Sequence, residues 1–150
     1  MIKRKKNSLI VSLDAMGGDN APDVVIEGAS IYSKKNKKIK FIIHGDEEHI
    51  LPIINNFRNL KNKVEVIHTD KFILSDEKPS NALRKGRDSS MGMTFQAVKD
   101  GRADCAVSAG NTGALMALSL FILRPMKGVK RPAICAAIPH SKGWSAVLDL

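Results

Sequence analysis

Residues 8–19 read SLIVSLDAMGGD, a short and mostly aliphatic run followed by an acid, two adjacent glycines and a second acid. An apolar run of this length that ends at glycines predicts a buried strand at Ser8–Asp14 and a tight turn after it. Pro22 suits the first turn of a following helix, which Asp19 or Asn20 would cap. A strand, a glycine turn and a helix in this order predict one unit of a parallel α/β sheet.

The same order of strand and helix recurs along the rest of the chain. Further strands are expected at Ile39–His44, Val64–His68, Ala103–Ser108, Ala133–Ile138 and Trp144–Leu150. Helices are expected at Pro22–Lys34, Gly45–Asn56, Ser80–Gly86 and Thr112–Leu123, with another that ends near Asp100 and is capped by Asp88 or Ser89. The predicted fold class is therefore α/β, with a mostly parallel sheet and helices on both faces.

The two ends of the sequence bear on how the chain is organised. Residues 1–7 are rich in Lys and Arg, which predicts a basic, flexible leader. No repeat or low-complexity linker divides residues 8–150, so these residues are expected to belong to one α/β domain. Because an intact fold rarely ends on an unpaired apolar edge, the apolar stretch that closes at Leu150 predicts a domain truncated at its C-terminus.

The charge of the chain leaves two interpretations open. A net charge of +9 comes from 24 Lys and Arg against 15 Asp and Glu. Such a balance fits a basic surface that attracts an anionic partner, or simply solvated faces and loops. The basic clusters lack interleaved aromatic residues and any nucleic-acid motif, so no nucleic-acid partner is expected. An acidic protein partner is compatible with either interpretation.

The cysteines and the apolar runs indicate the compartment. Cys105 and Cys135 lack the spacing of a zinc site, so no metal is expected, and both are predicted to be buried thiols in a reducing cytoplasm. The run Leu9–Leu13 is too short for an export signal, and Ala114–Leu123 is too short to cross a bilayer. A cytoplasmic location is therefore predicted, with peripheral contact at the inner face of the membrane left open.

The first candidate site motif is the turn that follows the first strand. Gly17 and Gly18 let the backbone turn sharply and approach a ligand, and Asp14 and Asp19 stand on either side of them. These residues fit the floor of an active site in which an acid orients a donor. They also fit a plain turn with a capping acid. A third glycine is missing, so the motif is not a dinucleotide fingerprint.

The second motif, SAGNTG, joins an apolar strand to an apolar helix and runs from Ser108 to Gly113. Its small residues, Gly110 among them, expose backbone N–H groups, and the side chains of Asn111 and Thr112 add further polar groups. A helix N-terminus carries partial positive charge, so the turn suits a phosphate or an oxyanion. A capped turn without a ligand is the alternative, and the number of converging small polar residues favours the ligand site.

Two arginines are weaker candidates, and several common chemistries have no motif here. Arg84 and Arg131 could each contact an anion, or could lie on an exposed helical face and in a loop. The sequence has no Gly-x-Ser-x-Gly elbow, no Walker motif and no Cys beside a His. A protein nucleophile is therefore not indicated.

Five ordered blocks of the sequence resemble those of bacterial phosphate acyltransferases of phospholipid synthesis. The blocks are LDAMGGD at Leu13–Asp19, PSNALR at Pro79–Arg84 with Ser90-Met91 after it, GRAD at Gly101–Asp104, VSAGNTGALMA at Val107–Ala117, and RPAI at Arg131–Ile134 with LDL at Leu148–Leu150. The similarity covers Leu9–Leu150. Five blocks in the same order are a far more specific signal than one glycine turn.

The resemblance implies an activity, a fold and a set of partners. The implied enzyme transfers a long-chain fatty acyl group from acyl carrier protein to inorganic phosphate, without a metal or an organic cofactor. Its fold is similar to that of phosphate acetyltransferases and isocitrate-type dehydrogenases. Its longer chain forms homodimers that work at the cytoplasmic membrane surface. Residues 8–150 would then be the N-terminal part of a single acyltransferase domain.

The resemblance also implies roles for the candidate residues. Asn111 is the predicted catalytic residue, and the predicted substrate-binding residues are Asp14, Gly17, Gly18, Asp19, Arg84, Ser108, Gly110, Thr112, Gly113 and Arg131. Two alternatives stay open. One is an inactive truncated fragment or a remnant that binds carrier protein. The other is a short-chain phosphate acyltransferase that uses coenzyme A thioesters.

Overall fold

The computed structural model describes residues 8–148, so the expected leader at residues 1–7 lies outside the described part. The elements in chain order are β1 (Leu9–Asp14), α1 (Asp23–Lys35), β2 (Ile39–Gly45), α2 (Glu47–Asn55), η1 (Arg58–Leu60), β3 (Val64–His68), α3 (Pro79–Lys85), η2 (Gly86–Asp88), α4 (Ser90–Lys99), β4 (Cys105–Val107), α5 (Thr112–Leu123), β5 (Cys135–His140) and β6 (Gly143–Leu148). The predicted alternation of strands and helices is confirmed.

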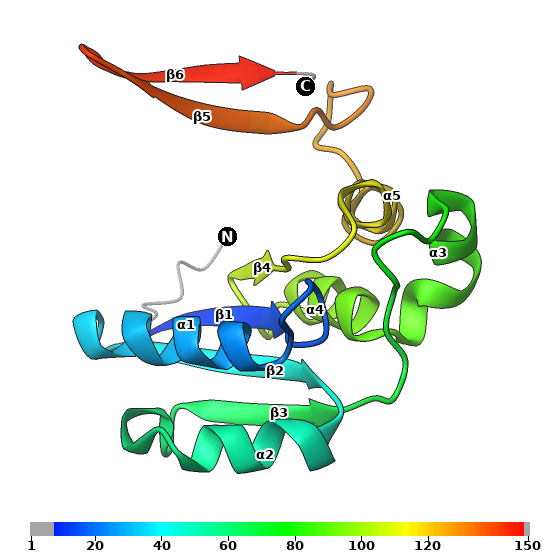
Figure 1. The fold of residues 1–150 in the computed structure, drawn as a ribbon. Coiled ribbons are helices and arrows are strands. Elements are labelled where there is room, and N and C mark those ends of the chain that lie inside the picture. The colour runs from blue at the N-terminus through cyan, green and yellow to red at the C-terminus, as the bar shows by residue number, and fades with distance from the viewer. Residues whose placement is uncertain (1–7, 149–150) are drawn as a thin grey trace.

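A four-stranded parallel sheet in the order β3-β2-β1-β4 forms the centre of the fold. Successive side chains of a strand point to opposite faces. Phe41 and Ile43 of β2 pack on the face with α1 and α2, while Ile42 packs on the opposite face with Ala97 of α4. Figure 1 shows these helices on the two faces, with α3 and α5 beyond the arrowheads of the strands. The predicted fold class is confirmed.

The helices beyond the sheet have an apolar core of their own. Met91 and Phe95 of α4 pack with Ala114, Leu118 and Ile122 of α5. Helix α5 contains no charged residue, and apolar side chains cover most of its circumference. A helix of this kind is stable only when neighbours cover it. Packing against α3 and α4 fixes the start of α5 next to the carboxyl edge of the sheet.

The last two strands form a separate antiparallel ribbon rather than joining the parallel sheet. Figure 1 shows β5 and β6 apart from the rest of the chain. Only two residues separate these strands, and Gly143 adopts a φ of 138°. So short a link can join only antiparallel neighbours, because parallel strands need a long crossover. Trp144 is 71% exposed on this ribbon.

Several local predictions are wrong. Pro22 occupies the N-cap position of α1 without a side-chain hydrogen bond, so neither Asp19 nor Asn20 caps that helix. Both cysteines are exposed, because β4 is an edge strand and β5 belongs to the two-stranded ribbon.

Within residues 8–148, no helix is long and apolar enough to cross a membrane.

Candidate active site

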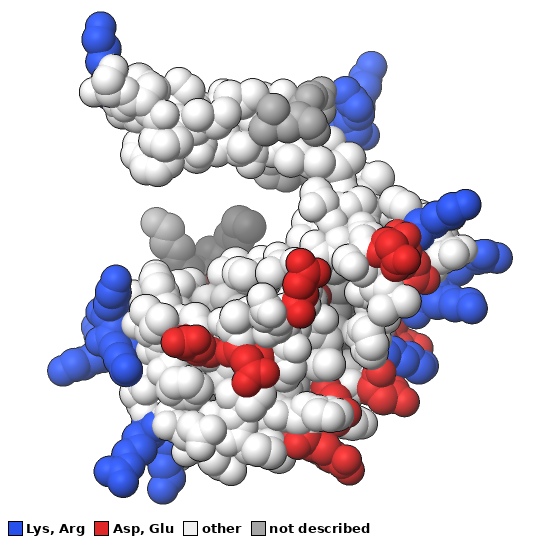
Figure 2. Space-filling view, in the orientation of Figure 1, with Lys and Arg blue, Asp and Glu red and all other residues white. Residues whose placement is uncertain are grey.

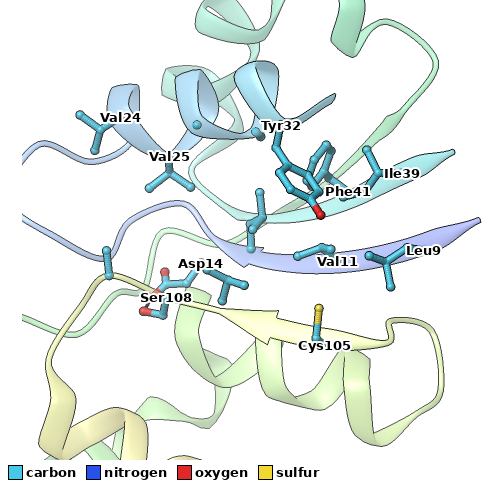
Figure 3. Close-up of a pocket in the computed structure, with 15 residues that line it drawn as sticks. Leu9, Val11, Asp14, Val24, Val25, Tyr32, Ile39, Phe41, Cys105 and Ser108 are labelled. Atoms are coloured by element: carbon cyan, nitrogen blue, oxygen red, sulfur yellow. Dashed lines mark hydrogen bonds between the residues drawn. The ribbon is translucent and has the colours of Figure 1, made fainter. Parts of the chain in front are cut away.

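The two glycine turns predicted from the sequence meet at the carboxyl edge of the sheet. Strands β1 and β4 are neighbours with Leu13 opposite Val107, so the residues that follow them lie side by side. The Ser108 hydroxyl donates a hydrogen bond of 2.6 Å to Oδ2 of Asp14, which is only 1% exposed. Figure 3 shows these two side chains pointing toward each other. This contact joins the turns of β1 and β4.

The contact between the turns leaves no room for a side chain at Gly17. A Cβ atom there would lie 2.6 Å from Oδ2 of Asp14, 2.8 Å from Oγ of Ser108 and 2.9 Å from the backbone N of Gly110. Gly18 adopts a φ of 105°, which residues other than glycine rarely adopt. Both adjacent glycines of the first motif are therefore required by this geometry.

Asn111 connects the second turn to a distant segment. Its Oδ1 accepts a hydrogen bond of 2.9 Å from the N–H of Ala114, which makes Asn111 the N-cap of α5. Its Nδ2 donates to the backbone carbonyls of Ser75 at 2.8 Å and Glu77 at 2.9 Å. Both ends of this amide are thus engaged within the fold and hold residues 74–77 against the start of α5. A catalytic role for Asn111 stays a prediction.

A cleft of about 420 Å³ opens where the two turns face the segment that Asn111 holds. Its lining includes Met16, Gly18, Asp19, Ser75, Gly110, Asn111 and Thr112. The first N–H groups of a helix have no acceptor within that helix, and they carry its positive end. The cleft at the start of α5 therefore offers backbone donors to an anion.

The other predicted residues lie outside this cleft. Arg84 is exposed, donates to Oδ1 of Asn81 at 3.0 Å, and lines a different cleft of about 590 Å³ with Lys71 and Arg87. Arg131 is exposed in the link between α5 and β5. Gly113 belongs to the first turn of α5, and a Cβ atom there would face Pro79 at 2.9 Å. The structure thus groups the two turns without bringing in either arginine.

An apolar groove of about 470 Å³ begins at the same pair of residues (Figure 3). It starts at Asp14 and Ser108 and follows β1 between α1 and β4. Its lining includes Leu9, Val11, Val24, Tyr32, Phe41 and Val107. At about 3.3 Å per residue, the six residues of β1 give the groove a length of roughly 20 Å. This groove was not predictable from the sequence, because its walls depend on which strand lies beside β1.

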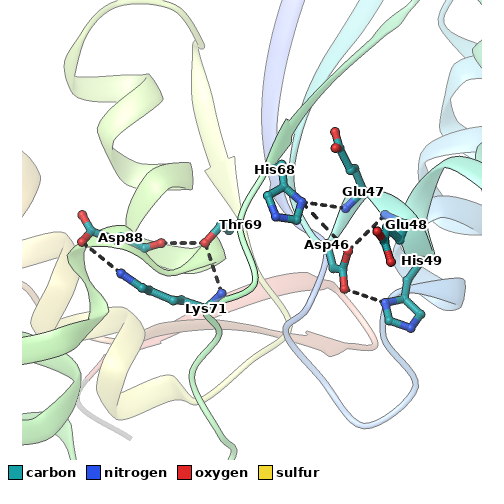
Figure 4. A network of polar contacts seen from close by, with 8 residues as sticks. All are labelled: Asp46, Glu47, Glu48, His49, His68, Thr69, Lys71 and Asp88. Atoms are coloured by element: carbon teal, nitrogen blue, oxygen red, sulfur yellow. Dashed lines mark hydrogen bonds and ion pairs between the residues drawn. The ribbon is translucent and has the colours of Figure 1, made fainter.

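The link that forms one wall of the cleft is fixed at its start by two polar networks (Figure 4). Asp46 caps α2 by accepting from the N–H of Glu48 at 3.0 Å, and it bonds Nδ1 of His49 at 2.8 Å. The hydrogen bond with His49 is the main reason that the pKa of Asp46 is lowered. Nearby, the hydroxyl of Thr69 donates to the carbonyl of Asp88 at 2.9 Å. The N–H of Glu47 donates to Nδ1 of His68, the last residue of β3, at 3.3 Å, so α2 and η2 both hold the chain as it leaves β3.

A buried histidine, His44, lies on the face of the sheet that packs against α4. Nε2 of His44 lies 3.0 Å from the hydroxyl of Ser12, while its Nδ1 has no hydrogen-bond partner in the described structure. Burial, and to a smaller degree the charge of Arg102, lowers the pKa of His44 to about 4. His44 does not line the cleft.

Among residues 8–148, no three His, Cys, Asp or Glu side chains are arranged to hold a metal ion.

Comparison with known proteins gives the family. The sequence pattern of a family described as fatty acid synthesis protein matches residues 9–150. The chain belongs to this family. The resemblance drawn from the five sequence blocks is thereby confirmed.

Relatives of this chain carry the name phosphate acyltransferase. The protein of Rhodospirillum rubrum is 45% identical over 144 residues, which are 96% of this chain and 41% of that protein. The protein of Parvibaculum lavamentivorans is 49% identical over 143 residues, or 95% of this chain and 40% of its own. The protein of Bradyrhizobium diazoefficiens is 49% identical over 141 residues, which are 93% of this chain and 40% of that protein. The chain thus spans about two fifths of the length of these relatives.

Proposed function

We propose that this chain is the N-terminal part of an acyltransferase that moves a long-chain fatty acyl group from acyl carrier protein to inorganic phosphate. Residues 8–150 would form part of a single domain of that enzyme. The observation that carries the proposal is the contact between Asp14 and Ser108, which joins two glycine turns beside the start of α5. The family description and the name phosphate acyltransferase of the relatives support acyl transfer to phosphate. The complete enzyme would be a cytoplasmic homodimer at the membrane surface, as the family resemblance implies.

The reaction needs anion binding rather than a protein nucleophile. An oxygen of phosphate attacks the thioester carbon, a C–O bond forms, the C–S bond breaks, and the carrier thiolate leaves and takes up a proton. Charge develops on the thioester oxygen in the transition state, so preorganised N–H donors accelerate the step. At the start of α5, the N–H and the hydroxyl of Thr112 line the cleft and would donate to phosphate or to this oxygen.

Ser108 and Asn111 contribute by holding the donors in place. A serine hydroxyl has one proton, and that of Ser108 is directed to Asp14 while its oxygen accepts from the N–H of Gly110 at 3.1 Å. Asn111 caps α5 and fixes the facing segment. We infer that both side chains position the donors of the turn, and that loss of either loosens the turn.

The apolar groove favours a long-chain donor over a short-chain coenzyme A thioester. It begins at the residues that join the turns and extends along β1 with an almost entirely apolar lining. A fatty acyl chain gains free energy in proportion to the apolar surface that it buries, and an acetyl group gains little there. A thioester carbon held near Ser108 would place its acyl chain in this groove.

Acyl phosphate formation from long-chain acyl carrier protein and inorganic phosphate tests the proposal. The assay compares the 150-residue chain with the same chain extended by the remaining three fifths of a relative's sequence, and it includes acetyl- and butyryl-coenzyme A as donors. We expect the extended chain to use the long-chain donor and to lose most turnover as Asn111→Ala. Turnover of the short donors alone would support the coenzyme A alternative. No turnover with any donor would contradict the proposal.

A further inference from the structure

A second concave surface lies at the opposite end of α5 from the cleft. It is a groove of about 480 Å³ between α3, the end of α4 and the C-terminal half of α5. Its floor is apolar and open to solvent, since Leu83 is 39% exposed, Leu120 41% and Phe121 57%. Large apolar side chains that gather in one exposed hollow mark an interaction site more often than single exposed ones do. We call this surface the α5 groove.

The rim of the α5 groove carries three cations and no carboxylate. Arg87, Lys99 and Arg124 line it, and none of them forms an ion pair or a side-chain hydrogen bond within residues 8–148. The acids next to them in sequence have other partners. Asp88, which does not line the groove, pairs with Lys71 at 3.5 Å, and Asp100 accepts from Gln96 at 2.7 Å.

The backbone at the rim is strained where one of these cations stands. Arg124 ends α5 with a φ of 64° and a ψ of 152°. A residue other than glycine in this region costs on the order of 1–3 kcal/mol, and such residues concentrate at functional sites. This strain is a second observation, independent of the charges, that singles out the same rim.

We propose that the α5 groove docks an acidic amphipathic helix of a partner protein, with apolar side chains on the floor and carboxylates against the three cations. An apolar floor inside a cationic rim is complementary to a helix of this kind. The hollow shape favours a helix over a lipid surface, because a membrane is contacted by protruding rather than recessed apolar side chains. Figure 2 shows Lys and Arg side chains gathered at the edge of the molecule where α3 lies in Figure 1, with acidic side chains beside them.

Resting on the proposed function, we assign the carrier protein that presents the acyl group as this partner. Acyl carrier protein is acidic, and α5 connects the groove to the cleft. With 12 residues at about 1.5 Å each, the helix spans roughly 18 Å. A carrier protein docked in the groove would therefore have to extend its thioester over about the length of α5 to reach the turn at Ser108.

Binding of fluorescently labelled holo acyl carrier protein to the 150-residue chain, followed by anisotropy, tests this assignment without requiring turnover. The test variant is R87E/K99E/R124E. The matched control is K34E/K35E/K38E, which makes the same change of charge on exposed lysines at the end of α1. We expect the rim variant to bind about tenfold more weakly, and the control to stay within about threefold of the unaltered chain. Circular dichroism melting of each variant verifies that it is folded.

Three outcomes would overturn the assignment. Equal weakening in the rim variant and the control would show that net charge alone attracts the carrier. Unchanged binding in the rim variant would place the docking surface elsewhere. Rim-dependent binding to phosphatidylglycerol vesicles without binding to carrier protein would make the groove a membrane contact. Rim-dependent carrier binding together with absent acyl phosphate formation would leave the groove standing and would contradict only the proposed function.

Discussion

Ser108 directs its only hydroxyl proton to Asp14, and Gly17 lies against both side chains. These three residues come from two turns more than ninety positions apart in the chain. Their contact leaves no space for even a methyl group on the inner face of the first turn. The shape of the candidate site therefore depends on the absence of a side chain as much as on the polar groups present.

Replacing Gly17 with Ala tests this dependence. We expect Gly17→Ala to lower the free energy of unfolding by about 1–3 kcal/mol, because the new Cβ would overlap the carboxylate, the hydroxyl and a backbone nitrogen. The matched control is Gly28→Ala within α1, where the new Cβ meets no atom within 4 Å apart from its chain neighbours and the backbone of its own helix. That change should stabilise the chain by about 0.5–1 kcal/mol. Urea denaturation measures both, and a neutral Gly17→Ala would contradict the close contact of the turns.

His44 makes a prediction about pH. Its pKa in the folded chain is about 4, below the ordinary value of 6.5, so the unfolded chain binds a proton that the folded chain does not between these values. Stability from this residue is complete above pH 6.5 and is lost as the pH falls toward 4, by roughly 3 kcal/mol at most. His44→Asn should flatten the fall in unfolding free energy between pH 7 and 4.5. An identical slope in both proteins would contradict a neutral buried histidine.

At the scale of elements, the start of α5 depends on a segment that follows β3. Asn111 holds residues 74–77 through two short hydrogen bonds to backbone carbonyls and caps its own helix. The segment also lines the cleft with Leu74 and Ser75. The cap and the cleft wall are therefore coupled through one side chain.

Asn111→Ala should loosen both elements together. Loss of an N-cap costs about 0.5–2 kcal/mol, and the released segment should exchange its amide hydrogens faster. Hydrogen exchange followed by mass spectrometry should show faster exchange in residues 74–77 and 112–115, with β2 unchanged. Asn36→Ala, which removes a longer hydrogen bond of 3.4 Å at the end of α1, is the matched control. Normal exchange in residues 74–77 would contradict the coupling.

The element pattern was predictable where short apolar runs alternate with helical segments. The parallel sheet follows from such runs at β1, β2 and β3, and each of the two turns was expected directly after a strand. The partners of Asn111 were not predictable, because they are backbone carbonyls and leave no sequence signal. The ribbon of β5 and β6 was missed as a separate unit, although the two residues before Gly143 are too few for a parallel crossover.

At the scale of the whole molecule, β4 is an edge strand and several apolar side chains beside it are exposed. Val107 is 51% exposed and Leu9 45%, both in the groove along β1. Parallel sheets are ordinarily covered on both faces. In the proposed enzyme this surface would accept the acyl chain. The bound chain would then cover the apolar side chains that are exposed along β1.

The proposed reaction depends on phosphate binding in the cleft. This binding is tested by titrating the isotopically labelled 150-residue chain with inorganic phosphate and following its ¹H–¹⁵N NMR spectrum. We expect saturable shifts at the amides of Gly18, Thr112 and Gly113, which Gly17→Ala abolishes while Gly28→Ala keeps them. Saturable shifts confined to the cleft lined by Arg84 and Lys71, or weak shifts spread over the surface lysines, would contradict a phosphate site at the paired glycine turns.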